Sequence, residues 1–254
     1  MPLDKYLAAH GFSSRTKAAR AISDGRVMLN GKLAAASDEV REGDLVVVED
    51  TEVSFVSEGG FKLYKALRDF GESVGGGVFA DIGASTGGFT DCLLQGGAKR
   101  VYAIDVGESQ LDEKLRKDPR VCVMDKCNAR YLKREDLAEK IDGVAIDVSF
   151  ISLKLLFEAV SGILPEHGRL FALIKPQFEC GPKALDKHGV VKSSRDRSNA
   201  VISVCNEAAK YGLYVKNLTC APLKPRKNIE YMALFTKNDK DLLTNEALEI
   251  KSRI

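Results

Sequence analysis

The chain has 254 residues, of which 44% are hydrophobic and 29% charged, and its formal net charge is +2. These values are typical of a soluble globular protein with a sizeable core and more than one domain, and the net charge alone demands no particular partner. Stretches without Asp, Glu, Lys or Arg reach only about nine residues, which excludes a membrane-spanning helix of about 20 apolar residues. The N-terminus also lacks the apolar core of a signal peptide.

The cysteines and histidines argue against a metal site. The six cysteines lie at positions 92, 122, 127, 180, 205 and 220. No two of them form a Cys-x-x-Cys pair, and no cluster of histidines accompanies them, so a zinc site is not expected. We therefore expect reduced cysteines, no bound metal and a cytoplasmic protein.

Residues 1–50 are expected to form a small α+β domain. LDKYLAAHG and SSRTKAARAISDG have apolar residues at helical spacing, and each is followed or ended by a glycine typical of a C-cap. RVMLNGKL contains an Asn-Gly pair typical of a hairpin turn, and DLVVVED is expected to be a short strand. Residues 1–32 carry six basic and two acidic side chains, so this domain holds a local basic excess. Residues 51–57 are expected to be a linker.

From residue 58 to 237, strand-like and helix-like segments alternate, which favours a parallel, doubly wound α/β sheet. Strands are expected at 78–82, 101–106, 120–124, 143–148, 169–175, 213–220 and 230–236. Helices are expected at 60–70, 88–96, 109–116, 134–139, 152–163 and 194–211. The loop APLKPRKNI leaves no room for a helix between the last two strands, so they should pair antiparallel. A seven-stranded, mostly parallel sheet of this kind is the Rossmann-like fold of S-adenosylmethionine-dependent methyltransferases, and it differs from the six parallel strands of dinucleotide dehydrogenases. The tail 238–254 is expected to be one loose helix.

The segment FADIGASTGGFTDCLL, residues 79–94, leads from a strand into a helix through a glycine-rich turn. As a dinucleotide fingerprint it has Ser85 where the second glycine belongs, and this weakens an NAD interpretation. In the other frame, Asp81 precedes Gly83, Gly87 and Gly88. A carboxylate there suits a cationic amino-acid ligand and would repel a pyrophosphate. The bland alternative is that the glycines only make a tight turn.

Two further carboxylates follow the next two strands. Asp105 comes 22 residues after Gly83, where a carboxylate would hold ribose hydroxyls. Asp125 ends the third strand and could meet an adenine amino group. A pocket for S-adenosylmethionine explains all three acids, so this is the expected cofactor. The expected cofactor-binding residues are Asp81, Gly83, Ser85, Gly87, Gly88, Phe89, Asp105, Val106 and Asp125.

The end of the fourth strand separates classes of methyl acceptor. Enzymes that methylate exocyclic base nitrogens commonly have an Asn/Asp-Pro-Pro-aromatic turn there, whereas this chain has AIDVSF without proline. The cysteine of FECGP is followed by proline two residues later, which does not match the nucleophile of 5-methylcytosine enzymes. Neither base-methylating class fits.

Charged side chains instead occupy strand ends and a helix where a site would lie. They are Lys62, Asp147, Lys175 and Glu230. Lys175 follows the buried-looking strand LFALI at the end where doubly wound sheets bind ligands. Two nearby lysines would lower each other's pKa and a carboxylate would oppose that shift, so a lysine could accept a proton from a ribose hydroxyl. Each residue alone could also be an ordinary strand-end charge.

Several long segments resemble the TlyA family, which belongs with the FtsJ-like ribose 2'-O-methyltransferases. They are VSEGGFKLYKAL, DIGASTGGFTDCLLQGGAKRVYAIDVGESQL, AIDVSFISL, LIKPQFE and HGVV. The N-terminal HGFSSRTKAARAISDGRVMLNGK is similar to the alpha-L RNA-binding module of a small-subunit ribosomal protein and of many pseudouridine synthases. Together the resemblances cover residues 1 to about 237.

The resemblance implies S-adenosylmethionine-dependent 2'-O-methylation of cytidines in ribosomal RNA by a Lys-Asp-Lys-Glu tetrad. Lys62, Asp147, Lys175 and Glu230 match that tetrad as catalytic residues. Two positions depart from the family pattern: Glu58 stands where relatives often carry arginine, and Ser109 where glycine is usual.

The basic N-terminal residues are the expected RNA contacts. Arg15, Lys17, Arg20 and Lys32 would bind phosphates, which contribute affinity more than sequence choice. KHGVVKSSRDR (187–197) and KPRK (224–227) could hold a flipped-out nucleotide, or could be solvated surface. The expected partners are ribosomal RNA or ribosomal subunits, without a membrane.

Two other functions remain open from the sequence. One is an RNA-binding or ribosome-assembly protein whose methyltransferase domain is inactive, although the intact tetrad argues against it. The other is a cytolysin, because the family is often labelled haemolysin, but no amphipathic or spanning segment supports a pore.

Overall fold

The computed structural model describes residues 1–12, 14–23, 25–30, 32–35, 37–48, 53–223, 226–237 and 242–253, with the side chains at 32 and 33 not included. These residues form two compact units. One unit contains Met1–Ser54 with Pro222–Lys227, and the other contains Phe55–Ala221 with Asn228–Ile254.

The first unit is the expected small α+β domain. Its elements are α1 (Leu3–Ala9), α2 (Arg15–Ser23), β1 (Val27–Leu29), β2 (Lys32–Leu33) and β3 (Val46–Val48). β1 lies between β2 and β3 and pairs antiparallel with both. Ser14 accepts a hydrogen bond from the Lys17 amide at the start of α2, as an N-cap does. Leu3 and Leu7 of α1 pack against Ala18 and Ala21 of α2 in a small apolar core.

The second unit carries seven strands and its own helices. The strands are β4 (Val78–Ile82), β5 (Arg100–Ile104), β6 (Val121–Met124), β7 (Gly143–Ile146), β8 (Arg169–Ile174), β9 (Tyr214–Cys220) and β10 (Tyr231–Thr236). The α-helices are α3 (Glu58–Phe70), α4 (Gly88–Gln95), α5 (Glu113–Arg116), α6 (Phe157–Ile163), α7 (Pro176–Glu179), α8 (Ser194–Ala209) and α9 (Asn245–Ser252). Short 3-10 turns are η1 (Ala129–Tyr131), η2 (Arg134–Asp136), η3 (Leu153–Leu155) and η4 (Pro182–Ala184).

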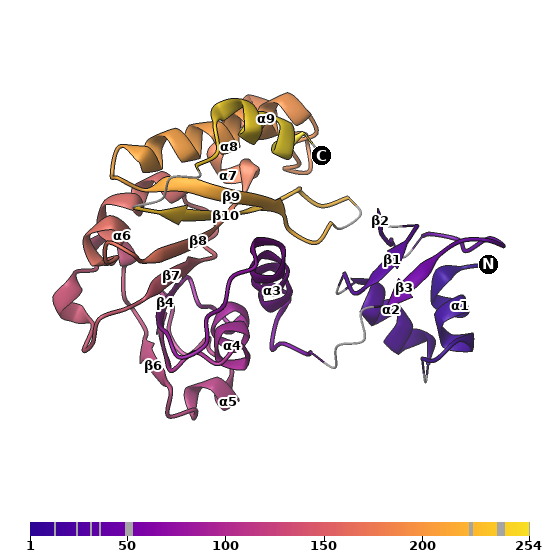
Figure 1. The fold of residues 1–254 in the computed structure, drawn as a ribbon, viewed down its shortest axis with the longest axis horizontal. Coiled ribbons are helices and arrows are strands. Elements are labelled where there is room, and N and C mark those ends of the chain that lie inside the picture. The colour runs from indigo at the N-terminus through magenta and orange to yellow at the C-terminus, as the bar shows by residue number, and fades with distance from the viewer. Residues whose placement is uncertain are drawn as a thin grey trace. The chain divides into compact units, whose positions relative to one another are not determined.

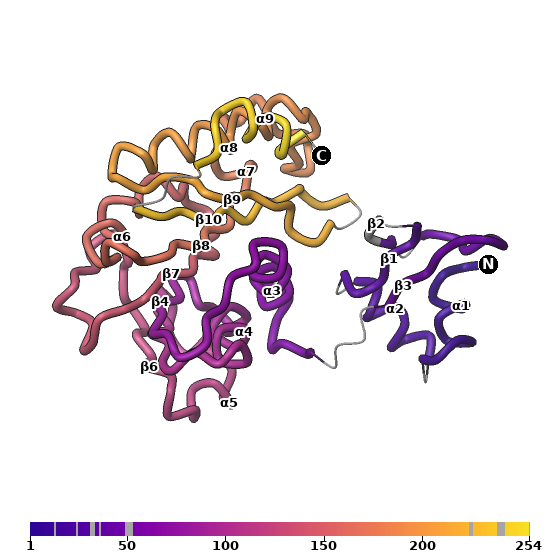
Figure 2. The backbone as a smooth tube through the Cα atoms, in the orientation of Figure 1, coloured from indigo at the N-terminus to yellow at the C-terminus, as the bar shows by residue number. Residues whose placement is uncertain are grey.

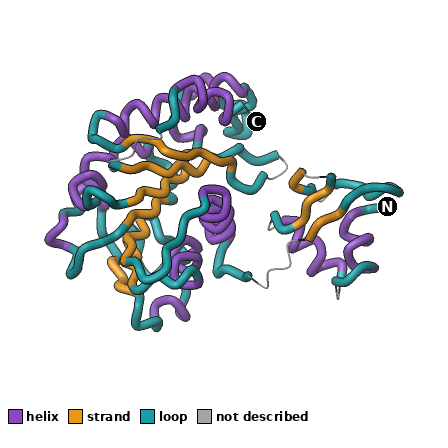
Figure 3. Tube along the Cα trace, viewed as in Figure 1, coloured by secondary structure: helices purple, strands orange, loops and turns teal. Residues whose placement is uncertain are grey.

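The seven strands form one sheet in the order β6-β5-β4-β7-β8-β10-β9. Figure 3 shows the strands in orange. The pairs among β6, β5, β4, β7 and β8 are parallel, and β10 is antiparallel to both β8 and β9. This confirms the predicted mostly parallel sheet and the antiparallel pairing of the last two strands. The parallel strands therefore end at one common edge, with the loops after β4, β5, β6, β7 and β8 beside one another.

Helices cover both faces of this sheet (Figure 1). Alternate residues of β4 show the division: Val78, Ala80 and Ile82 belong to the large core under α6 and α8, whereas Phe79 lies outside that core. The helices α3 and α4 pack against each other on the other face. Because both faces are covered, the central strands are buried along their whole length.

Three of the predicted helices differ most from the structure. The segment 109–116 is helical only from Glu113, because Ser109 has φ 56° in the left-handed region and Asp112 caps the helix by accepting from the Lys114 amide. A helix at 134–139 was wrong, since only the 3-10 turn η2 forms there. The segment 152–163 divides into η3 and α6, with Ser152 capping η3.

The C-terminal helix α9 is present but is packed rather than loose, which corrects the expectation for the tail. It lies beside α8, where the yellow end of the trace runs along the orange helix (Figure 2). Leu248 is 1% exposed and Ser252 is fully buried. Residues 238–241 of the predicted tail lie outside the described part of the chain.

Candidate active site

The glycine-rich turn between β4 and α4 brings three elements together. Gly83 has φ 81°, and a Cβ there would lie 2.6 Å from the Asp147 carbonyl oxygen, so glycine lets the ends of β4 and β7 meet. Gly87 has φ 99°, and its Cβ would lie 2.2 Å from a methyl of Leu115. A Cβ on Gly88 would lie 2.3 Å from Ser57 Oγ. Gly87 thus serves packing around the turn, whereas Gly83 lines both of the cavities described next and Gly88 lines the smaller one.

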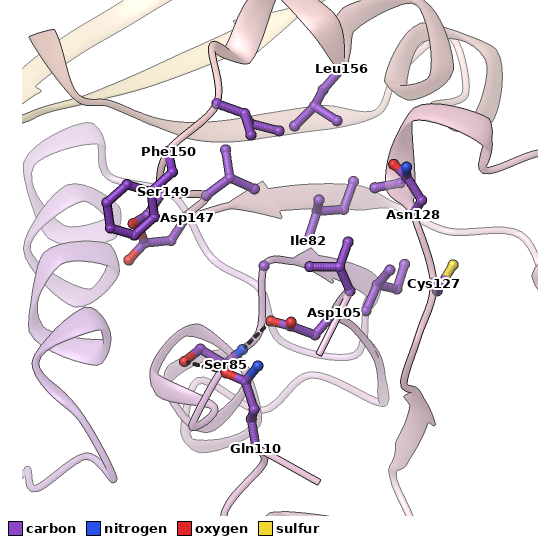
Figure 4. A pocket seen from close by; sticks show the side chains of 16 residues that line it. Ile82, Ser85, Asp105, Gln110, Cys127, Asn128, Asp147, Ser149, Phe150 and Leu156 are labelled. Atoms are coloured by element: carbon purple, nitrogen blue, oxygen red, sulfur yellow. Dashed lines mark hydrogen bonds between the residues drawn. The ribbon is translucent and has the colours of Figure 1, made fainter. Parts of the chain in front are cut away.

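A cavity of about 450 Å³ opens at the carboxyl ends of β4, β5 and β7 (Figure 4). Its lining residues are Ile82, Gly83, Ser85, Ile104, Asp105, Val106, Gln110, Cys127, Asn128, Ala129, Asp147, Val148, Ser149, Phe150, Ile151 and Leu156. The volume is in the range of small-molecule sites, and the lining combines apolar walls with a few carboxylate, amide and hydroxyl groups.

Asp105 stands at the end of β5 on the cavity wall. Its Oδ2 accepts from the Ser85 amide at 2.8 Å, and its Oδ1 accepts from the Gly107 amide at 2.7 Å (Figure 4). These bonds fix the carboxylate, and each oxygen keeps a second lone pair for a ligand hydroxyl. The Ser85 backbone has φ 49°, so its amide is aimed at Asp105 by a left-handed turn.

A second, smaller cavity of about 170 Å³ adjoins the first. It is lined by Ser57, Gly59, Gly83, Ala84, Ser85, Thr86, Gly88, Phe89, Asp147, Ser149 and Lys175. Gly83, Ser85, Asp147 and Ser149 line both cavities, so these residues form the boundary between the two spaces. The smaller cavity is more polar and brings Lys175 within reach of a molecule in the larger one.

Lys175 is held between two groups at the end of β7. Its Nζ lies 2.6 Å from Asp147 Oδ1 in an ion pair and donates to Ser149 Oγ at 2.8 Å. Lys175 is 8% exposed, although it lines the smaller cavity. A charged amine buried to this extent requires such a partner, because an unpaired one would be strongly destabilising. Its side chain is therefore fixed at the cavity surface.

Glu230 joins this group through the sheet register. Tyr231 pairs with Ile174, and continuing this antiparallel register by one residue sets Glu230 opposite Lys175. Glu230 Oε2 accepts from Lys62 Nζ at 2.7 Å, and Oε1 accepts from Gln177 Nε2 at 3.3 Å. The four residues of the predicted tetrad thus form two ion pairs, one between Asp147 and Lys175 and one between Lys62 and Glu230.

The pKa of Lys62 is shifted upward by this arrangement. Burial by itself would lower it, but the carboxylates of Asp147 and Glu230 outweigh the burial, and the pKa lies above its ordinary value of 10.5. The expected mutual lowering by neighbouring lysines therefore does not dominate at Lys62. This side chain is a stable cation at neutral pH.

Asp81 lies behind the cavity wall rather than on it. It is fully buried, its Oδ2 accepts from Thr90 Oγ1 at 2.6 Å, and its Oδ1 is buried without a hydrogen-bond partner. Burial raises the pKa of Asp81 to about 7. Asp81 lines neither cavity, so the structure does not bring this carboxylate to a ligand directly.

The other predicted cofactor residues differ in position. Val106 lines the larger cavity, and Phe89, 2% exposed, lines the smaller one. Asp125 lines neither: its Oδ2 accepts from the Ser109 amide at 3.2 Å and from Arg116 at 3.0 Å. These bonds lower the pKa of Asp125, the Ser109 amide contributing most. Asp125 holds the loop after β5 in place.

Sequence reasoning missed several residues around the cavities. Asn128 lies on the wall after β6, close to the place predicted for Asp125. Phe150 is 88% exposed with φ 65°, lines the larger cavity, and has its ring 5.3 Å from that of Phe178. Position after a strand could have indicated Asn128, but no pattern separates Phe150 from core aromatics.

Of the predicted RNA contacts, three lie on α2. Arg15, Lys17 and Arg20 are exposed, and Arg15 makes an ion pair with Asp4 at 2.7 Å. Lys32 is in β2, and its side chain is outside the described part of the structure. Helix α2 thus presents basic groups to solvent.

The two predicted basic loops have different outcomes. In 187–197, Arg197 is 7% exposed and bonds the carbonyls of Val191 and Lys192, so this side chain is structural and not a surface contact. In 224–227, residues 224 and 225 lie outside the described residues.

Two expected absences were searched in the described residues. Over those ranges, no group of three or more His, Cys, Asp or Glu side chains is arranged to hold a metal ion. In the same part of the chain, each helix is too short or too polar to cross a bilayer.

Comparisons with known proteins agree with this fold. Residues 55–237 match the model of the FtsJ-like methyltransferases, and residues 1–46 match that of the S4 domain. The 16S/23S rRNA (cytidine-2'-O)-methyltransferase TlyA of Mycobacterium tuberculosis is 39% identical over 246 residues, covering 94% of this chain and 91% of that protein. Hemolysin A of Brachyspira hyodysenteriae is 39% identical over 239 residues, covering 92% and 99%.

A solved structure and a partial relative complete the comparison. A haemolysin-labelled protein from Streptococcus thermophilus is 37% identical, with a TM-score of 0.75 over 99% of this chain and 94% of that one. The pseudouridine synthase RluF of Escherichia coli is 48% identical over 46 residues, which are 18% of this chain and 16% of that protein. On this evidence the chain is an FtsJ-like methyltransferase and a member of the TlyA family.

Proposed function

We propose that this protein transfers a methyl group from S-adenosylmethionine to the ribose 2'-hydroxyl of a cytidine in ribosomal RNA. The observation that carries the proposal is the position of Lys175, which lines a polar cavity that shares four lining residues with a cofactor-sized one. The relatives named as rRNA (cytidine-2'-O)-methyltransferases support the choice of substrate. A ribosomal substrate is also the reason to expect a cytoplasmic enzyme.

The larger cavity fits S-adenosylmethionine by the chemistry of its lining. Asp105 would accept hydrogen bonds from ribose hydroxyls, and Asn128 would offer an amide to the adenine. Gly83, whose added Cβ has no space, would let the chain approach the amino-acid end closely. The cofactor supplies an already activated methyl group, so the protein has only to align the acceptor and manage its proton.

Lys175 is the group to orient the 2'-hydroxyl. Its amine would pass one proton to the paired Asp147 carboxylate and take up the hydroxyl proton as the oxygen acquires the methyl group and S-adenosylhomocysteine leaves. Asp147 and Ser149 hold the Lys175 amine at the cavity surface. The Lys62–Glu230 pair stands beside it as a fixed cation and carboxylate. Its role would be to orient the acceptor nucleotide and to set the electrostatic field around Lys175, rather than to exchange protons.

The acceptor base would lie against Phe150. An 88% exposed phenyl ring on the cavity wall has no folding reason to face water, and bases stack favourably on such rings. A stacked base would set its ribose toward the smaller cavity, where Lys175 lies.

RNA affinity would come from residues 1–50, and chemistry from residues 58–237. Arg15, Lys17 and Arg20 of α2, with Lys32 of β2, would neutralise phosphates. The double variant Lys17→Glu, Arg20→Glu should weaken binding of ribosomal RNA at least tenfold. The affinity of this variant for RNA should also depend less steeply on salt concentration. The affinity for S-adenosylmethionine should stay unchanged in this variant.

The direct test uses purified protein, tritiated S-adenosylmethionine and ribosomal subunits, with the modified position mapped as a 2'-O-methyl nucleotide. Lys175→Ala should reduce transfer about 10²- to 10⁴-fold while cofactor binding remains. Lys154→Ala is the matched control, because Lys154 also donates to a serine hydroxyl, that of Ser203. Unchanged transfer by Lys175→Ala refutes the mechanism. Cofactor binding without methylation of any ribosomal particle favours an RNA-binding assembly protein instead.

A further inference from the structure

A buried polar cluster lies on the face of the sheet away from Lys62. Glu230 and Tyr231 are consecutive at the start of β10, and successive side chains of a strand point to opposite faces. Glu230 meets Lys62 of α3, whereas the Tyr231 hydroxyl meets α8 and α9. Tyr231 therefore holds the backbone next to Glu230 through hydrogen bonds on the opposite face of the sheet.

The Tyr231 hydroxyl joins three parts of the chain. It is buried, accepts from Arg197 Nε of α8 at 3.2 Å and donates to the Ser252 carbonyl of α9 at 2.7 Å. Ser252 Oγ also bonds Ser198 Oγ at 2.9 Å. Core packing alone would not need these polar groups, since phenylalanine would fill the same volume without the cost of burying a hydroxyl and a guanidinium.

The same cluster extends to the hairpin Leu185–Val191, whose ends are joined by an antiparallel bridge. Arg197 Nη1 donates to the Val191 carbonyl at 3.3 Å and to the Lys192 carbonyl at 2.8 Å. Asn228, two residues before Glu230, accepts from the Val191 amide at 2.9 Å and donates to the Gly189 carbonyl at 2.9 Å. Arg197 and Asn228 thus both bond to the hairpin. Both are also connected to Glu230, Arg197 through the neighbouring residue Tyr231 and Asn228 through the backbone.

We propose that Arg197 and Tyr231 are positioning residues that couple the docked helix α9 and the Leu185–Val191 hairpin to Glu230, and through it to Lys62. The inference rests on the proposed methyl transfer, for which Glu230 must sit beside Lys175. Neither Arg197 nor Tyr231 lines the cavities, so their effect on the reaction passes through the backbone on either side of Glu230.

The test compares Tyr231→Phe with Tyr102→Phe in the full chain. Tyr102 is a matched control: it is 1% exposed, and its hydroxyl accepts from the Glu139 amide at 3.2 Å in the same unit, away from Glu230. Each variant loses one buried tyrosine hydroxyl. Initial rates over ranges of S-adenosylmethionine and ribosomal subunits give kcat and KM, and hydrogen exchange reports on residues 185–192 and 226–231.

Tyr231→Phe should lower kcat about five- to tenfold with KM for S-adenosylmethionine unchanged, and should speed amide exchange in the hairpin. Tyr102→Phe should stay within twofold of the unaltered protein in kcat and leave the hairpin unchanged. Equal kcat values for the two variants overturn the inference. If the unaltered protein transfers no methyl group, the proposed function fails, and the coupling is then judged by exchange alone: unchanged hairpin exchange in Tyr231→Phe overturns it.

Discussion

Asp81 should make the stability of the protein depend on pH in an unusual direction. Its carboxyl is fully buried, one oxygen accepts from Thr90, and the other has no hydrogen-bond partner. Burial favours the neutral acid and raises the pKa to about 7 from 3.8. Because the folded pKa is above the unfolded one, the neutral form stabilises the fold at low pH. That contribution is lost as the pH rises through 7.

The size of this effect follows from the shift. Each pKa unit corresponds to about 1.4 kcal/mol, so the shift of Asp81 is equivalent to about 4 kcal/mol between pH 4 and pH 8. Asp81→Asn removes the titration. Its amide would add a buried donor without an acceptor at a cost of about 1–3 kcal/mol, but this cost does not vary with pH. The free energy of unfolding of the variant minus that of the unaltered protein should therefore rise by about 4 kcal/mol over this range.

Urea unfolding at pH 4 to 8, followed by far-UV circular dichroism, measures that difference; the chain has no tryptophan for fluorescence. Asp118→Asn is the control, because the pKa of Asp118 is shifted in the opposite direction. The hydrogen bond from Arg120 holds the pKa of Asp118 below its ordinary value of 3.8, so the stabilising effect of Asp118 is lost only below that pH, and the difference for Asp118→Asn should stay constant over the range measured. A pH-independent difference for Asp81→Asn would refute the reasoning.

Three further predictions concern strain, packing and the Lys62 pair. Ser109→Gly should relieve the left-handed backbone (φ 56°) and raise the melting temperature by about 1–3 °C in calorimetry, with a lower value counting against it. Gly87→Ala should cost at least about 1 kcal/mol more than Gly76→Ala in urea unfolding, since both have positive φ but only Gly87 has a neighbour, Leu115, where the Cβ would go; equal costs would contradict this. Lys62→Met should lower the free energy of unfolding by about 1–3 kcal/mol at pH 8. This difference from the unaltered protein should shrink above pH 10.5, as the unaltered Lys62 loses its proton. A difference that stays constant with pH would argue against the ion pair.

The sheet could be predicted from the sequence because its strands are continuous apolar runs. Val78–Ile82 is buried at every position, and the predicted and observed bounds coincide. Helices that begin with a polar turn were harder, as at 109–116, because a left-handed serine is not recognisable from its residue type. Local propensity also cannot show that α9 docks, since its contacts are with α8 and β9, far earlier in the chain.

The ion pairs of the candidate site could also be predicted only in part. The ends of parallel strands meet at one edge, so Asp147 and Lys175 could be expected together from their positions alone. That Lys62 pairs with Glu230 depends on the register of β10 against β8, which the sequence does not specify. The direction of the Asp81 side chain could not be predicted for a related reason: a strand-end carboxylate can point into the cavity or towards α4, and its hydrogen bond from Thr90 decides between them.

The order of the strands along the chain has a consequence for biosynthesis. Every residue that lines the larger cavity lies between positions 82 and 156, whereas Lys175 and then Glu230 are translated later. All residues of the larger cavity's wall have thus left the ribosome well before β10 can insert between β8 and β9. The Lys62–Glu230 ion pair can consequently form only after the wall of the larger cavity has been synthesised.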